Sequence, residues 1–147
     1  MTERGSIQAR LARGFDPAEL RRIKRLWVRH SIAEDRRDID GLLATLSEAC
    51  IYEIVPTGQR WDGHDGARRF YGELFAAFPD NAFALSEIVI GPQGVFEVAT
   101  LTGTNQGPWA GVPASGMAVS LEVLIYFPWD PATERFTGER IWFDRGS

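Results

Sequence analysis

The chain has 147 residues, a mass of 16.4 kDa, a formal net charge of −4 and a pI of about 5.2. This length suits one domain with its own core, and the acidic balance gives no electrostatic support to nucleic-acid binding. The only cysteine, Cys50, excludes an intrachain disulfide and a cysteine-based metal site, and the only two histidines make a histidine-rich metal site unlikely on composition. No apolar run reaches the ~18 residues that a membrane span needs. We therefore expect a cytoplasmic protein that has no metal, no cofactor and no membrane partner.

Three helices are predicted in the N-terminal half. Asp16-Pro17-Ala18-Glu19 combines a capping aspartate, a proline at the first helical position and a capping-box glutamate, so a helix is expected from there to about residue 34. Its apolar face includes His30, which should point inward. A short second helix is expected after Asp38 or Asp40. Residues 66–78 carry apolar side chains at positions i, i+3, i+4, i+7 and i+11, which is the clearest helical period in the chain.

The rest of the chain is expected to form strands. Five segments are rich in β-branched and aromatic residues and are bounded by glycine and proline turns: residues 49–56, 83–90, 95–105, 117–127 and 133–144. Arg60 to Gly63 is predicted to be a turn or a short return strand, and Pro128 to Pro131 a turn. Short connections favour antiparallel pairing. The fold class is therefore α+β, with residues 1–15 as a flexible tail and residues 16–147 as one domain.

Four sequence segments follow one another in a particular order: DIDGLL at 38–43, GHDGARRFY at 63–71, LTGTNQG at 101–107 and GERIWFD at 138–144. In this order they resemble the SnoaL-like polyketide cyclases of the nuclear transport factor 2-like superfamily. The resemblance implies a cone, in which about three N-terminal helices pack on a strongly bent, mainly antiparallel sheet and close an apolar pocket. It also implies a homodimer formed through the sheet.

The resemblance implies that Asp144, on the last strand, is the acid–base catalyst. Successive side chains of a strand leave opposite faces, so Asp144 shares a face with Trp142 and Arg140. Beside Trp142 a partly desolvated carboxyl would have a raised pKa suited to a general base. The alternative is that Asp144 ends the strand in solvent and pairs with Arg140 or Arg145.

Two more residues are candidates for catalysis. The family's third-strand motif usually reads Gly-Thr-His, and here it reads Gly103-Thr104-Asn105. Asn105 can donate a hydrogen bond to a carbonyl or enolate but cannot exchange a proton near neutral pH; the alternative is a turn residue. His30 could contact the ligand or could be a core histidine that is hydrogen-bonded to a neighbour.

The predicted function is that of a cofactor-independent enzyme acting on a small apolar carbonyl compound, as a cyclase, isomerase or dehydratase. The residues expected to line the pocket and bind substrate are Trp142, Tyr52, Trp27, Tyr126 and Arg140. The alternative is a non-catalytic domain of the same fold, which binds a hydrophobic ligand or serves dimerisation. The sequence leaves open whether the protein is an enzyme.

Overall fold

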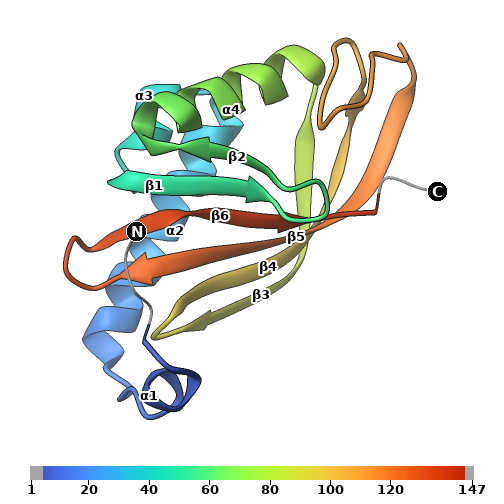
Figure 1. The fold of residues 1–147 in the computed structure, drawn as a ribbon. Coiled ribbons are helices and arrows are strands. Elements are labelled where there is room, and N and C mark those ends of the chain that lie inside the picture. Colours follow the sequence, from blue (N-terminus) through green and yellow to red (C-terminus); the bar gives the residue numbers. More distant parts are fainter. Residues whose placement is uncertain (1–4, 145–147) are drawn as a thin grey trace.

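The computed structural model describes residues 5–144, and within them helices and strands follow the predicted α+β order (Figure 1). The helices are α1 (Ile7–Leu11), α2 (Pro17–Asp35), α3 (Ile39–Leu43) and α4 (Gly63–Ala77). The strands are β1 (Leu46–Ile54), β2 (Gln59–Asp62), β3 (Ala82–Gly91), β4 (Gly94–Thr104), β5 (Ala118–Asp130) and β6 (Arg135–Trp142). None of the described helices is long and apolar enough to cross a membrane.

The strands form one sheet in the order β2-β1-β6-β5-β4-β3. All neighbours pair antiparallel except β1 and β6, which are parallel, so the predicted mainly antiparallel sheet is confirmed. Register shifts interrupt the β1–β6, β3–β4 and β5–β6 pairings, and such irregularities bend a sheet. Figure 1 shows the long strands β3 to β5 curving toward the C-terminal end of α4.

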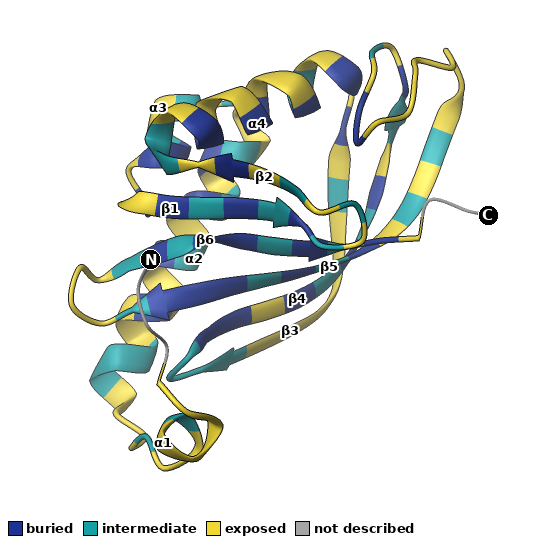
Figure 2. Ribbon diagram, viewed as in Figure 1, coloured by how far each residue is buried: buried dark blue, intermediate teal, exposed yellow. Residues whose placement is uncertain are grey.

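Helices α2 and α4 cover one face of the sheet, which we call the inner face; the opposite face is the outer face. The predicted start of α2 is confirmed, because the Asp16 side chain accepts a hydrogen bond from the Ala18 backbone N–H at 2.9 Å and Pro17 follows. His30 is buried with the apolar residues of this helix, as expected. Figure 2 shows the buried residues gathered between the helices and the sheet.

Two local expectations differ from the structure. Part of the segment expected to be a flexible tail forms helix α1, where Arg10 Nε donates a hydrogen bond to Gln93 Oε1 at 2.7 Å; residues 1–4 lie outside the description. The turn expected at Pro128 is instead part of β5, which continues to Asp130. The chain reverses after Asp130, and Glu134 there has a φ of +53°.

A bulge in β6 decides which of its side chains reach the inner face. In the pairing of β5 with β6, Trp129 lies opposite Phe136, and Tyr126 lies opposite Arg140. Three residue steps along β5 therefore correspond to four residue steps along β6. Gly138 lies in this interval with a φ of +118°, and a side chain there would collide with the Ile51 backbone. The extra residue reverses the alternation of buried and half-exposed side chains along the rest of the strand.

Candidate functional site

The centre of the candidate site is the carboxyl group of Glu139, which β6 presents to the inner face. Glu139 is 3% exposed, and its Oε2 accepts a hydrogen bond from the Tyr71 hydroxyl of α4 at 2.7 Å. His30 of α2 places Nε2 3.1 Å from the same oxygen. The Tyr52 hydroxyl of β1 lies 2.6 Å from that of Tyr71. Four elements thus bring one buried polar network together, which we call the Glu139 network.

The hydrogen bonds around His30 fix where its protons lie. The Thr45 hydroxyl donates to the Leu42 carbonyl oxygen at 2.7 Å, so toward His30 Nδ1, 2.8 Å away, it can only accept. Nδ1 therefore carries a proton. A hydrogen bond between Nε2 and Glu139 Oε2 then needs one further proton, which these two atoms share. His30 and Glu139 form an acid–base couple that holds this single proton.

Glu34, on α2, adds a second carboxyl to the site. One of its carboxylate oxygens lies within 4.8 Å of the facing atoms of His30 and Glu139. Burial, and then the negative charge of Glu139, raise the pKa of Glu34 well above its usual range. Half-buried Glu34 therefore holds its proton to a higher pH than an ordinary glutamate does.

Further groups of the inner face also stay protonated. Burial, and then the charge of Glu139, raise the pKa of Glu97 on β4 to about 8. The same two causes, in the same order, raise the pKa values of Tyr52 and Tyr71 well above the usual range. Both phenols are therefore neutral hydrogen-bond donors over the whole physiological pH range.

Glu34 and Glu139 line a small cavity between the sheet and α4. Its volume of about 20 Å³ suits roughly one water molecule. The rest of the lining is predominantly apolar and includes Phe70, Leu74, Leu101, Val123, Ile125 and Ile141. A ligand larger than water enters only if part of this wall moves.

One group of side chains within the described residues 5–144 has its ligand atoms close enough together to hold a metal ion. It consists of His30, Glu34 and Glu139. The same three side chains supply the acid–base groups of the site.

Comparison with known proteins identifies the family. The family model described as SnoaL-like polyketide cyclase matches residues 20–145 of the chain. The chain belongs to the SnoaL-like polyketide cyclase family. None of the curated proteins matches it.

Solved structures agree with this SnoaL-like fold. A protein provisionally described as a SnoaL-like polyketide cyclase from Jannaschia sp. CCS1 is 22% identical, with 90% of this chain and 92% of that chain covered and a TM-score of 0.71. A similarly described protein from Shewanella denitrificans OS-217 is 15% identical, with 88% and 92% covered and a TM-score of 0.71. AclR from Streptomyces galilaeus, provisionally described as a hydroxylase, is 19% identical, with 85% and 76% covered and a TM-score of 0.67. At these identities the likeness shows the fold alone.

Two of the residues predicted for the SnoaL-like pocket meet in the Glu139 network, namely His30 and Tyr52. Trp27 is half-buried and packs against the core, but it does not line the cavity. Asn105 is buried in the loop after β4, and its Nδ2 donates to the Pro113 carbonyl oxygen at 3.4 Å. Asn105 does not line the cavity either.

The other predicted residues lie on the outer face. Asp144 is exposed and lines an outer depression with Trp142, so its expected place in the pocket is wrong. Arg140 Nη2 donates to Glu53 Oε1 at 3.4 Å and its guanidinium lies 5.1 Å from the Trp142 ring centroid. Tyr126 donates a hydrogen bond to the Gln93 carbonyl oxygen at 3.2 Å. The physical reason is the bulge, which turns Glu139, rather than the residues that alternate with it, toward the interior.

Sequence reasoning missed Glu34, Tyr71 and the role of Glu139. Glu34 follows His30 by four residues, so both lie on one face of the helix. That spacing could have indicated the pair. Tyr71 belongs to the apolar period of α4 and carried no separate signal.

The raised pKa of Glu97 makes the stability of the protein depend on pH. Folded Glu97 binds its proton up to about pH 8, whereas the unfolded chain releases it near the ordinary value of 4.5. The free energy of unfolding should therefore fall between about pH 5 and 8, by at most ~1.4 kcal/mol per pH unit from this group. Urea denaturation of Glu97→Gln should show a shallower fall. Glu122→Gln, on an exposed residue of β5, should keep the wild-type slope, and an unchanged slope in Glu97→Gln would contradict the assignment.

Proposed function

We propose that this protein is an enzyme that moves protons on a small apolar carbonyl compound, through an enol or enolate bound at the inner cavity. The observation that carries the proposal is the Glu139 network with Glu34 beside it, whose pKa burial and then the charge of Glu139 raise. Burying ionisable groups costs several kcal/mol each. One carboxyl of this cavity has a raised pKa, and the other shares a proton with a histidine. Such a pair is typical of an acid–base site.

The arrangement assigns a task to each carboxyl. Neutral Glu34 donates its O–H to the carbonyl oxygen of the substrate, and Glu139 removes the proton from the adjacent carbon. The electron pair of the broken C–H bond then forms the enol double bond, while the carbonyl oxygen takes the negative charge or the proton of Glu34. Both hydrogen bonds to Glu139 named above fall on Oε2, so we assign proton removal to Oε1.

His30 and the two tyrosines support this step. The proton shared with His30 Nε2 can settle on the imidazole when Glu139 acts as a base, and Thr45 holds the ring in the required tautomer. Tyr71 and Tyr52 form a chain of neutral donors that stabilises the carboxylate. An enol formed in this way can attack a second carbonyl, shift a double bond or expel water. Ring closure, isomerisation and dehydration are thus the candidate reactions, and the description of the family as polyketide cyclases favours the first.

The proposal is tested by exchange of the α-protons of 2-tetralone in D2O, followed by NMR. The wild-type protein should accelerate the exchange above the buffer rate. Glu139→Gln should lower the acceleration by about 10²- to 10⁴-fold, the usual size of a general acid–base contribution. Glu34→Gln should also lower it, because its amide cannot give up a proton. Asp144→Asn should retain the wild-type rate, since Asp144 is exposed on the outer face.

Two results would count against this assignment. Loss of exchange in Asp144→Asn with normal exchange in Glu139→Gln would move the chemistry to the outer face. Binding of the ketone without any exchange would favour the alternative, a non-catalytic binding domain. Circular dichroism and thermal unfolding of each variant separate loss of activity from loss of fold.

We also propose that two copies of the chain form a homodimer through the outer face of the sheet. Val89 and Phe96 are paired neighbours on β3 and β4 whose apolar side chains are 64% and 37% exposed. On the same face lies a groove of about 720 Å³, lined in part by Tyr126 and Arg140. A partner would cover the apolar residues and close this groove.

The dimer proposal predicts that Val89→Lys combined with Phe96→Lys gives a monomer, because two charges would have to be buried at the interface. Light scattering after size-exclusion chromatography measures the mass. Ile32→Lys changes an apolar residue of α2 that is exposed to a similar extent, and it should leave the dimer intact. A wild-type monomer, or a dimer that persists in the double variant, would refute the interface.

A further inference from the structure

Trp109 is held against the cavity by a tight turn in the loop between β4 and β5. Backbone hydrogen bonds of 2.9 Å join Trp109 and Val112 in both directions. Ala110 and Gly111 between them have φ values of +51° and +78°, as a turn of this tightness requires. The loop is fastened to the C-terminal end of α4 by the Gln106 N–H, which donates to the Ala77 carbonyl oxygen at 2.7 Å.

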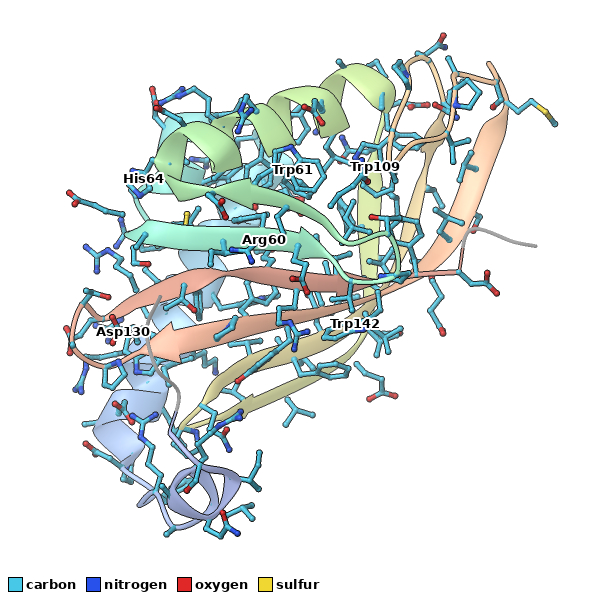
Figure 3. All side chains as sticks on the ribbon, viewed as in Figure 1. Arg60, Trp61, His64, Trp109, Asp130 and Trp142 are labelled. Atoms are coloured by element: carbon cyan, nitrogen blue, oxygen red, sulfur yellow. The ribbon has the colours of Figure 1, made fainter. Side chains whose placement is uncertain are left out.

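The indole ring of Trp109 packs between aromatic side chains. It stacks on Phe143 with a centroid distance of 5.1 Å and an interplanar angle of 16°, and it meets Phe78 edge-on at 5.6 Å. Trp109 is 9% exposed and lines the same cavity as Glu34 and Glu139. Figure 3 shows Trp109 between α4 and the strands, while Trp142 lies on the other side of β6.

The indole N–H of Trp109 is buried and has no hydrogen-bond partner among the described residues. Buried donors in folded proteins almost always have a partner, and leaving one unpaired is costly. A second tryptophan shows the usual arrangement, since Trp129 Nε1 donates to Glu19 Oε2 at 3.3 Å. The unpaired donor of Trp109 therefore points to an acceptor that arrives with a ligand.

We infer that Trp109 Nε1–H binds a second oxygen of the substrate, at a distance from the oxygen that faces Glu34. This inference rests on the proposed function for the first oxygen and adds the class of substrate. The substrate is a small, flat, mainly apolar ring compound with two oxygen functions. One is the carbonyl that reacts at Glu139, and the other is a carbonyl, ether or hydroxyl oxygen that accepts from Trp109.

The shape of the cavity supports this substrate class. The apolar lining, which includes the aromatic rings of Phe70 and Trp109, favours a flat ring over a flexible chain. The cavity of about 20 Å³ has to widen before such a ring can enter. Trp109 is a wall residue of this cavity, so the widened site includes its indole ring.

Binding of two matched ketones tests the inference. 2-Tetralone has one oxygen, whereas 6-methoxy- and 7-methoxy-2-tetralone carry a second acceptor on the far ring. Calorimetric dissociation constants should show that Trp109→Phe, which keeps a ring but removes the N–H, weakens the better methoxy ligand by about 5- to 30-fold. The same variant should change the affinity for 2-tetralone by less than about twofold, because 2-tetralone has no second acceptor to lose. Trp142→Phe, on the outer face, should change neither affinity.

The outcomes separate the failure of this inference from that of the proposed function. Equal weakening of all three ketones by Trp109→Phe would show a packing role and overturn the inference, as would no preference for a methoxy ketone in the wild type. Absence of binding by every tetralone would overturn the substrate class. A methoxy preference that depends on Trp109, without α-proton exchange, would uphold the second contact and refute the catalytic proposal.

Discussion

The interior of this protein is arranged around one buried carboxyl group, that of Glu139, which is 3% exposed. A charge in that position must be balanced, and the structure does so with the proton shared with His30 and with the phenol of Tyr71. Burial, and then the negative charge of Glu139, raise the pKa values of Glu34 and Glu97. The protonation of the site is therefore one coupled system whose members are supplied by both helices and strands.

The backbone feature that places Glu139 is the bulge at Gly138. Without the extra residue, the face of β6 that includes Arg140 and Trp142 would turn inward. A glycine is required there because φ is positive and the Ile51 backbone is close. A local irregularity in one strand thus decides which titratable group occupies the interior, and with it the chemistry open to the fold.

The sequence predicted the fold class, the main helices and most of the strand segments, because periodicity and capping are local properties of the chain. It also placed His30 and Tyr52 correctly in the interior. The family resemblance assigned the acid to Asp144. Alternation along the strand could not correct this assignment, because it repeats every two residues and does not say which set faces inward. The bulge that settles this depends on the pairing of β6 with two neighbours. The unpaired N–H of Trp109 likewise depends on contacts between distant segments, and no local pattern indicated it.

The central claim is that the interior holds a neutral carboxylic acid, Glu34, beside the proton-sharing pair of Glu139 and His30. Carbon-detected NMR of the glutamate side-chain carboxyls, assigned with Glu34→Gln, measures this directly in the ligand-free protein. The account predicts that the Glu34 resonance remains that of a protonated acid at pH 7 and titrates far above the ordinary value of about 4.3. An ionised Glu34 at pH 7, with a titration midpoint near 4.3, would contradict it, because the site would then have no proton to donate.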